Sequence, residues 1–411
     1  MNTRNTTKER GGESGRGFHV AFLTSHPIQY QAPFFRAMAN SGDDVDVFFS
    51  WGVGAQSAAY DPEFGLNIKW DTPLLSGYPS VFLKNLSPRP SGAFFGQINP
   101  AIFGYLKRKK YDAFVVLGWN ALTNWIAVFY ASARGIPVFL RGENPLSHEY
   151  SHSAVKRFVK RILLKALFSR IDHVLYIGEE NRKFYEFYGV PAEKLVFAPY
   201  AVENERFIAA ATELKARRNE LRAAHGFSPG QPIILFVGKL IEKKRPMDLL
   251  DAYGQFVERT RRVGIRAPGL VFVGSGMLQH KLELYVSRMH LDEVRFVGFK
   301  NQTELPELYA LGDVLVLPSG LGETWGLVVN EAMCFGVPII VSDHVGCGPD
   351  LVKEGENGFI VPVRDIRVLS SRIEELMSDP RKRERFGERS RAIISRYDYQ
   401  ADISAIHSCL S

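Results

Sequence analysis

The sequence predicts an α/β protein with two doubly wound domains. Short apolar runs recur along the chain with helical patterns between them, an arrangement typical of parallel strands joined by crossover helices. The length of 411 residues allows two or three domains with large buried cores. A content of 45% hydrophobic and 23% charged residues is ordinary for a folded protein and excludes a disordered, collagenous or coiled-coil chain.

The first domain is expected to occupy residues 18–205. It opens with the strand FHVAFL, which is followed by a polar loop and by a helical pattern that Gly42 closes. Helices are also predicted at 121–134 and 154–169. Further strand-like runs of this half start at Asp44, Asp112, Ile136 and Asp172.

The second domain is expected to occupy residues 231–395, after a linker at 206–230 that overlaps a charged helical stretch. Its apolar runs end at glycine, proline or serine, and helical patterns separate most of them. This pattern predicts a second doubly wound domain of the size of a nucleotide-binding domain. These runs lie at 233–238, 269–274, 294–298, 314–318, 338–342 and 358–362.

Two segments outside these patterns are expected to be irregular. Residues 1–17 are polar, charged and glycine-rich, which predicts a disordered leader. The stretch 51–104 is rich in glycine, proline, serine and aromatic residues, which favours a binding wall over a core.

The overall charge favours anionic partners. The chain carries 51 basic and 44 acidic residues, for a net charge of +7. The cations cluster instead of forming a stripe with stacking aromatic residues, so we expect no nucleic-acid binding. The three cysteines have no spacing that suits a metal site, and no apolar run is long enough to span a membrane, so a cytoplasmic protein is expected.

Polar side chains follow three predicted strands of the first domain. In an open α/β sheet the ligand lies beyond the carboxyl ends of the strands, so these residues are candidates for binding, although each by itself suits a surface or capping role. They are His26, Gln29, Tyr30, Gln31, Trp119, Asn120, Arg141, Glu143 and Asn144.

The predicted helix at 154–169 combines apolar and basic residues. One stripe at helical spacing is expected to face the core, namely Val155, Phe158, Val159, Ile162 and Ala166. The other side is expected to expose Leu164, Leu167 and Phe168 among the cations Lys156, Arg157, Lys160, Arg161 and Lys165. Such a face suits an anionic membrane surface, and the alternative is a solvated helix whose extra apolar residues pack under a loop.

The first loop of the second domain reads GKLIEKKRP. Gly238 allows close backbone approach, and Lys239 and Lys244 place positive charge near the start of the next helix, whose free N–H groups favour an anion. A diphosphate would fit there, and the alternative is a solvated basic loop. Gly274 lies in a second glycine-rich strand end.

The motif SGLGETWGLVVNEAMCFGVPIIVS begins at Ser319. Glu323 precedes a helix that is expected to start near Leu327, after Gly326, and Glu331 lies about one turn inside it. A loop carboxylate can hold sugar hydroxyls, the free N–H groups of the helix N-terminus a phosphate, and a carboxylate on the helix ribose hydroxyls. The plainer alternative is a capping acid and an acid on the helix face.

Taken together, these motifs resemble those of the retaining, GT-B-fold glycosyltransferases of family 4, also called group 1. The resemblance is strong over 233–364, and SHPIQYQAPFFRAMA resembles the opening of one subgroup. It implies a GT-B fold of two Rossmann-like domains facing a central cleft, with the donor held by the second and the acceptor by the first. It also implies a terminal helix within 396–411 that crosses back to the first domain.

The resemblance assigns a role to each matching residue. Lys239 and Lys244 correspond to the residues on the donor diphosphate, Glu323 to the acid on the donor sugar, and Glu331 to the acid on the ribose. The expected catalytic residues are Lys239, Lys244, Glu323, His26 and Arg141. The expected donor-binding residues are Gly238, Gly274, Val297, Phe299, Thr324, Gly326, Leu327 and Glu331. The expected acceptor-binding residues are Gln29, Tyr30, Trp119, Asn120 and Glu143.

Two departures from the family pattern lie in the first domain. His26, Pro27, Ile28 and Gln29 replace a glycine pair, and Arg141 stands where an active-site histidine is often found, so His26 is an alternative source of an imidazole.

The expected activity is transfer of a sugar, with retention, from a nucleoside-diphosphate sugar to a glycan or glycolipid acceptor in surface-polysaccharide or glycolipid assembly. No metal and no cofactor beyond the donor is expected, and the enzyme could lie on the inner face of the membrane through Lys156, Arg157, Lys160 and Arg161. The alternatives are a GT-B-fold sugar-nucleotide epimerase and a nucleotide-sugar-binding protein without turnover.

Overall fold

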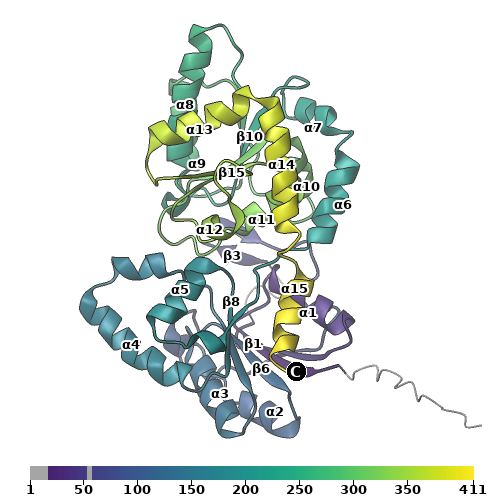
Figure 1. Cartoon of the computed structure of the whole chain (residues 1–411), viewed down its shortest axis with the longest axis vertical. Helices are drawn as coiled ribbons and strands as arrows, with labels where there is room; N and C mark the ends of the chain where they lie inside the picture. Colours follow the sequence, from purple (N-terminus) through teal and green to yellow (C-terminus); the bar gives the residue numbers. More distant parts are fainter. Residues whose placement is uncertain (1–16, 53–57) are drawn as a thin grey trace, which may run out of the picture.

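The computed structural model describes residues 17–52 and 58–411, in two lobes that each contain a parallel sheet (Figure 1). The leader expected at 1–17 lies outside the described residues except for Gly17. The strands of each sheet pair in parallel, as the alternation of strands and helices predicts, and the α/β class with two doubly wound domains is confirmed.

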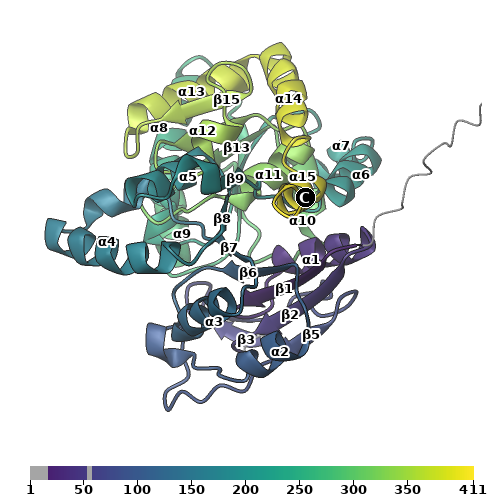
Figure 2. The same ribbon diagram turned by 60° about the horizontal axis from the view of Figure 1, so that its bottom comes forward.

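The sheet of the first lobe has seven strands in the order β5-β2-β1-β6-β7-β8-β9. Helices α1 and α15 cover one face and α2 and α3 the other, as Figure 2 shows. The strands are β1 (His19–Thr24), β2 (Asp44–Phe49), β5 (Ser80–Phe82), β6 (Ala113–Leu117), β7 (Val138–Arg141), β8 (His173–Tyr176) and β9 (Leu195–Phe197). The helices of this lobe are α1 (Gln31–Asn40), α2 (Ile102–Arg108), α3 (Leu122–Ala133), α4 (Ala154–Phe168) and α5 (Glu179–Phe187).

The sheet of the second lobe has six strands in the order β12-β11-β10-β13-β14-β15. Its core strands are fully buried because helices cover both faces. The strands are β10 (Ile233–Val237), β11 (Gly269–Val273), β12 (Val294–Phe296), β13 (Val314–Leu317), β14 (Ile339–Ser342) and β15 (Gly358–Val361). The helices are α8 (Pro246–Arg262), α9 (Gln279–Arg288), α10 (Leu305–Leu311), α11 (Leu327–Cys334), α12 (Gly348–Leu351), α13 (Ile366–Ser378) and α14 (Pro380–Ile394).

The segment between the sheets is helical. Helices α6 (Asn204–Leu214) and α7 (Arg218–Ala224) bury Phe207, Leu214 and Leu221 in the core of the second lobe. The residues expected to form a linker at 206–230 therefore pack with that lobe, and the domain boundaries themselves stay predictions.

The last helix, α15 (Tyr399–Ser408), packs beside α1 in the first lobe. Asp402 on this helix accepts two hydrogen bonds from Arg141 Nη1, each of 2.6 Å. His407 Nε2 lies 2.7 Å from Asp43 Oδ2. The chain thus returns to the lobe in which it began.

The prediction for helix α4 was wrong about which face is buried. All five residues of the stripe expected to face the core are exposed, with Val155 74% and Phe158 65% accessible. Leu164, Leu167 and Phe168, which were expected among the exposed cations, are buried instead.

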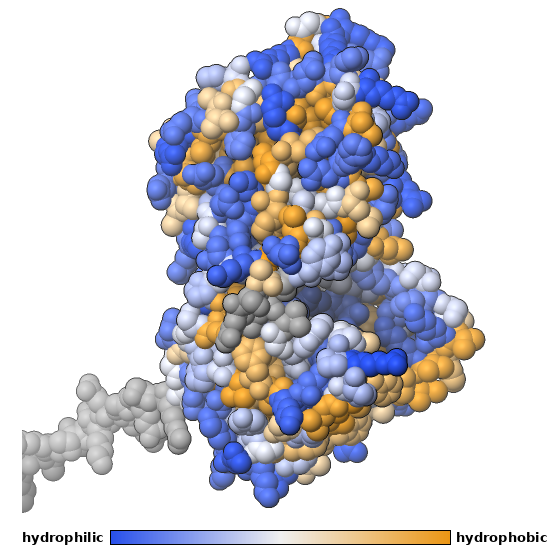
Figure 3. Space-filling view, turned by 180° about the vertical axis from the view of Figure 1, so that it is seen from behind, coloured by the Kyte–Doolittle hydropathy of each residue, from blue (hydrophilic) through white to orange (hydrophobic). Residues whose placement is uncertain are grey.

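A cation on the inner side of α4 accounts for this orientation. Lys160 reaches inward to Glu149, with an Nζ to Oε1 distance of 2.6 Å, and lies over the rings of Phe184 and Tyr188. The apolar packing is confined to the end of the helix, and the stripe from Val155 to Ile162 therefore stays in solvent. Apolar side chains are visible along the edge of this lobe in Figure 3.

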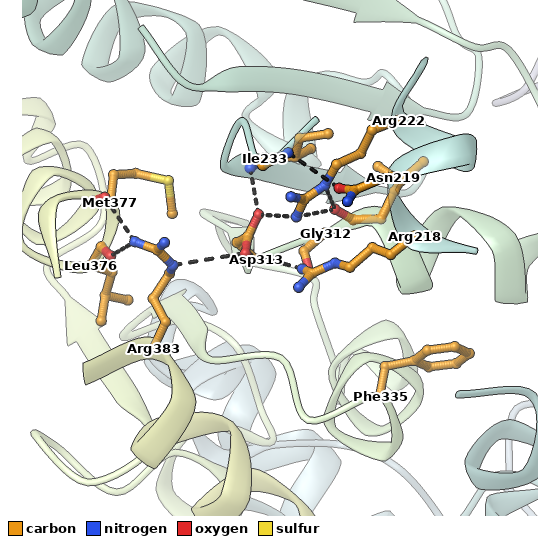
Figure 4. Close-up of polar contacts among 12 residues, drawn as sticks. Arg218, Asn219, Arg222, Ile233, Gly312, Asp313, Phe335, Leu376, Met377 and Arg383 are labelled. Carbon is orange, nitrogen blue, oxygen red and sulfur yellow. Dashed lines mark hydrogen bonds and ion pairs between the residues drawn. The ribbon is translucent and has the colours of Figure 1, made fainter. Parts of the chain in front are cut away.

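Asp313, directly before β13, joins several elements of the second lobe (Figure 4). Its carboxylate accepts from the backbone N–H of Ile233 at 2.7 Å and pairs with Arg222 at 2.6 Å and Arg218 at 3.0 Å. Arg383 Nε on α14 lies 3.8 Å from the same group. One carboxylate thereby ties α7, β10, β13 and α14 together.

No helix among the described residues is both long and apolar enough to cross a membrane.

Candidate active site between the two lobes

A cavity of about 370 Å³ lies at the carboxyl ends of the second sheet, between the lobes. Gly238 and Gly274, which directly follow β10 and β11, line this cavity. A Cβ on Gly274 would lie only 2.0 Å from the carbonyl oxygen of Gly238, so the close approach of the two segments requires glycine. A hollow between the lobes is also visible from behind in Figure 3. The predicted residues that line this cavity are Gln29, Tyr30, Gly238, Lys239, Lys244, Gly274, Phe299 and Glu331.

Lys244 and Glu323 form an ion pair at one side of this cavity. Both side chains are mostly buried, and Ser319 Oγ also donates to Glu323 at 3.0 Å. Burial would raise the pKa of Glu323, but the charge and hydrogen bond of Lys244 hold it below its ordinary value. Glu323 is therefore ionised at neutral pH.

Helix α11 places Glu331 at the cavity. Gly326 caps the helix at φ 102°, a left-handed conformation that favours glycine. Glu331 is 1% exposed, and its Oε2 accepts from Tyr309 OH at 2.6 Å. Its Oε1 is also buried but has no hydrogen-bond partner among the described residues. Burial raises the pKa of Glu331 to about 7.

A buried carboxylate oxygen without a partner needs a donor, because an unsatisfied polar group in the interior is costly. Since Glu331 lines the cavity, a ligand hydroxyl is the donor that fits.

Lys239 meets the first lobe across the cavity. Its Nζ lies 2.9 Å from Asp61 Oδ2 and 2.6 Å from Glu63 Oε2. These two acids were not among the predicted site residues, and neither were Phe64 and Trp70, which line the same cavity. They come from the stretch expected to be irregular, where the sequence DPEF has the only visible signal, a turn between polar residues.

A second cavity, of about 280 Å³, lies in the first lobe beside the end of β7. Arg141 lines it, but Asp402 already pairs with this guanidinium and Pro199 O accepts from it at 3.2 Å. Burial raises the pKa of Glu143 in the same wall. The predicted residues that line this cavity are Tyr30, Trp119, Asn120, Arg141, Glu143 and Thr324.

Five predicted residues line neither cavity, namely His26, Val297, Glu323, Gly326 and Leu327, although Glu323 pairs with Lys244, which lines the first one. His26 Nδ1 lies 2.9 Å from Ser25 Oγ, and burial lowers the pKa of the imidazole.

The imidazole of His148 lies at the loop of Glu323. Its Nε2 accepts from the backbone N–H of Gly322 at 2.9 Å, which joins the short helix η2 (Leu146–Ser151) of the first lobe to the second lobe. Sequence reasoning missed this residue because it lies seven positions after the end of β7.

No group of three or more metal-ligating side chains occurs in the part of the chain that the structure describes.

Two family models match the chain. The glycosyl transferase 4-like domain matches residues 27–201, and the model described as glycosyl transferases group 1 matches residues 217–393. The chain belongs to the group 1 glycosyltransferases. This group 1 assignment agrees with the motifs around Lys239 and Glu331 and with the two lobes that carry them.

Among the similar proteins, spore coat protein SA of Bacillus subtilis is 36% identical over 182 residues, which are 42% of this chain and 46% of that protein. The alpha-D-kanosaminyltransferase of Streptomyces kanamyceticus is 31% identical over 48% of this chain and 49% of its own length. The chain thus spans about half the length of these relatives. The D-inositol 3-phosphate glycosyltransferase of Corynebacterium diphtheriae is 25% identical over 86% of this chain and 81% of its own.

Solved structures show that the fold of this group 1 glycosyltransferase is GT-B. Anabaena Alr3699/HepE in complex with UDP superposes with a TM-score of 0.71 at 18% identity, covering 95% of this chain and 99% of that one. WaaG, a glycosyltransferase involved in lipopolysaccharide biosynthesis, superposes with a TM-score of 0.64 at 16% identity, covering 95% and 99%.

Proposed function

We propose that the protein transfers a sugar from a nucleoside-diphosphate sugar to an acceptor hydroxyl, with retention of the anomeric configuration. The observation that carries this proposal is Glu331, whose buried Oε1 has no hydrogen-bond partner within 17–52 and 58–411 and which lines a cavity together with Lys239 and Lys244. A carboxylate for ribose hydroxyls and two cations for a diphosphate are the groups that such a donor requires.

In this proposal the donor lies in the cavity of the second lobe, in the segment 231–395. Glu331 accepts from the ribose, and the N-terminal backbone of α11 lies toward the sugar and phosphate. Glu323, whose ionised carboxylate sits beside Lys244, accepts from hydroxyls of the donor sugar. The base rests near Phe299.

The chemistry depends on stabilising the leaving group. As the bond between the sugar and the diphosphate breaks, negative charge grows on the diphosphate, and Lys239 and Lys244 stabilise it. A phosphate oxygen of the leaving group takes the proton of the attacking acceptor hydroxyl. No metal takes part in this scheme, so transfer is expected to persist in EDTA.

The acceptor lies in the cavity of the first lobe, in the segment 18–205, with Trp119, Asn120 and Glu143 as its walls. A place in polysaccharide or glycolipid assembly is supported by similarity to WaaG, which is involved in lipopolysaccharide biosynthesis. The relatives that are named as transferases favour this activity over an epimerase or a protein without turnover.

The test combines binding and turnover. UDP, GDP, ADP and dTDP are screened by thermal shift, and the sugar donors of the tightest nucleotide are then tested for hydrolysis and transfer. We expect one diphosphate to bind and its sugar donor to turn over, with the product anomer the same as that of the donor. Binding of none of the four would refute the donor site, and binding without turnover would leave only the nucleotide-sugar-binding alternative.

We also propose that α4 docks the enzyme on an anionic membrane surface, where a lipid-linked acceptor would lie. Val155, Phe158 and Ile162 project into solvent, and Lys156 and Arg161 are exposed among them. This combination suits anionic headgroups over a partly inserted apolar stripe.

Flotation with vesicles tests the membrane proposal. The protein is expected to float with vesicles of phosphatidylcholine and phosphatidylglycerol, and not with phosphatidylcholine alone. The variant Phe158→Ser with Ile162→Ser should lose flotation, whereas Val263→Ser with Ile265→Ser, at exposed apolar positions of the second lobe, should retain it. Absence of flotation of the unaltered protein would end the proposal.

A further inference from the structure

The segment from Ala59 to Asp71 belongs to the first lobe but lies against the donor cavity of the second. Strands β3 (Ala59–Asp61) and β4 (Leu66–Ile68) pair antiparallel, and Figure 1 places β3 between the two lobes. The segment follows β2 and precedes the edge strand β5. We call residues 59–71 the hairpin segment.

The tip of the hairpin segment carries two acids that bind the lysine assigned to the donor diphosphate. Asp61 offers both oxygens to Lys239 Nζ, at 2.9 and 3.2 Å, and Glu63 Oε2 lies 2.6 Å from the same nitrogen. The ring of Phe64 lies 4.8 Å from this nitrogen. One cation is therefore held by two carboxylates.

The rest of the hairpin segment rests on the wall around Phe299. The rings of Phe64 and Phe299 meet edge to face at 5.1 Å, and Trp70 approaches Phe299 at 6.2 Å. Ser275 Oγ donates to the carbonyl of Phe64 at 3.1 Å. Near the base of the segment, Asn301 Nδ2 donates to the carbonyl of Lys69 at 2.8 Å.

Both lysines of the proposed diphosphate site are thus neutralised within the chain, Lys244 by Glu323 and Lys239 by the hairpin segment. The two pairs differ in burial. Glu323 is 10% exposed, whereas Asp61 is 30% and Glu63 52% exposed, so solvent screens the hairpin pair far more. The hairpin pair is the one that an incoming anion can displace.

We infer that Asp61 and Glu63 form an acidic latch that competes with the donor diphosphate for Lys239, so that the donor enters only as the hairpin segment releases this lysine. The inference rests on the proposed function for the identity of the anion. A diphosphate on Lys239 would face the two carboxylates at short range, and like charges at that distance repel strongly. The aromatic contacts of Phe64 and Trp70 let the segment stay near the cavity after its acids have moved.

The latch has a consequence for binding. The variant Asp61→Asn with Glu63→Gln removes the competing charge and should bind the tightest of UDP, GDP, ADP and dTDP about three- to tenfold more tightly by calorimetry, as expected for loss of a partly exposed competitor. The matched control is Glu186→Gln with Glu193→Gln, which removes two exposed charges of the same lobe away from the cavity and should leave affinity within about twofold.

A double-mutant cycle with Lys239→Met makes the test specific. If the acids act through Lys239, their removal should improve affinity in the unaltered background and not in the Lys239→Met background. An equal gain in both backgrounds would mean general electrostatics and would overturn the latch. Unchanged or weaker binding after removal of the acids would overturn it as well.

A measurement without ligand separates the latch from the proposed function. Hydrogen exchange of backbone amides in 58–71 should be faster in Lys239→Met than in the unaltered protein, because the tip has lost its anchor. Equal exchange rates would overturn the latch even if a diphosphate binds. Faster exchange together with binding of none of the four diphosphates would instead refute the donor site while leaving the contact with Lys239 intact.

Discussion

At the scale of single residues, the proposed donor site contains two carboxyl groups whose pKa values are shifted in opposite directions. The neighbouring charge of Lys244 holds the pKa of Glu323 low, whereas burial raises the pKa of Glu331 to about 7 in spite of its hydrogen bond from Tyr309. Glu331 thus costs stability when it is ionised, and under the proposed function the ionised form is the one that accepts hydrogen bonds from ribose hydroxyls. Binding sites commonly lower the stability of the protein without its ligand in this way.

The first prediction concerns Glu331→Gln. Because the folded protein holds a proton on Glu331 between pH 4.5, its ordinary pKa, and about 7, this residue lowers stability as pH rises through that window. A glutamine carries no charge and keeps an acceptor for Tyr309, so it should stabilise the protein by about 3 kcal/mol at pH 8 and by almost nothing at pH 4.5. Urea unfolding at the two pH values measures this.

The same variant should bind nucleoside diphosphate about tenfold more weakly at pH 8, since hydrogen bonds to a charged acceptor are the stronger ones. In the unaltered protein affinity should fall as pH drops through 7. A flat pH profile, or a variant that is no more stable at pH 8 than at pH 4.5, would contradict the assignment.

The second prediction concerns the pair of Lys244 and Glu323. Lys244→Met leaves a buried carboxylate without its partner and should destabilise the protein by about 3 kcal/mol while weakening diphosphate binding. Adding Glu323→Gln should restore most of the stability but not the affinity. If affinity returned together with stability, Lys244 would be a structural residue only.

At the scale of elements, short contacts between segments far apart in sequence decide which face a helix or hairpin presents. Helix α4 carries two apolar stripes, and its periodicity alone favours the longer one, but Lys160 and its partner Glu149 turn the shorter one inward. The exposed apolar face that results is the one on which the membrane proposal rests. Similarly, Arg141 was expected to act in catalysis and is held by Asp402 on α15.

The third prediction tests the ion pair between Arg141 at the end of β7 and Asp402 on α15. Arg141 is 12% and Asp402 3% exposed, so Asp402→Ala leaves a buried guanidinium unpaired and should cost about 3 kcal/mol in urea unfolding. Replacing both, as Arg141→Met with Asp402→Leu, should recover most of that loss. A single variant as stable as the parent would mean that α15 adds little to the first lobe.

At the scale of the whole molecule, the two lobes touch closely at Gly178. A Cβ at this position would lie 2.4 Å from the Trp325 ring and 2.6 Å from Asp350 Oδ2, both in the second lobe. Asp350 also accepts from the backbone N–H of Glu179, at the start of α5. Two contacts therefore fix the lobes relative to each other. One is the close packing at Gly178, and the other is the hydrogen bond between Gly322 and His148 near the cavity.

The fourth prediction is that Gly178→Ala separates the lobes. Each lobe keeps its core, but a shift of the cavity walls should lower transfer by about 10- to 100-fold, as small misplacements of reacting groups do. Small-angle scattering should show a larger radius of gyration. Gly104→Ala on α2, where an added Cβ meets no atom within 4 Å, is the control and should leave both quantities unchanged.

Apolar runs and the glycines that follow them are local signals. They predict the α/β class, the strands of both sheets with four or more residues, and the start of α11 after Gly326. Strands β5 and β9 have three residues each and are not followed directly by a glycine, so they could not be predicted, whereas the equally short β12 could be predicted because its apolar run ends at Gly298. The contacts of Lys239 with Asp61 and of His148 with Gly322 join residues more than 170 positions apart, and no local pattern encodes them.

Helix α15 has a bearing on how the chain acquires its structure during synthesis. The lobe that leaves the ribosome first contains a buried guanidinium, and the carboxylate that neutralises it is translated 261 positions later. The first lobe therefore lacks this ion pair until the last helix has been synthesised. Such a chain should refold in two kinetic phases, and the slower phase should disappear when Arg141 and Asp402 are both made apolar.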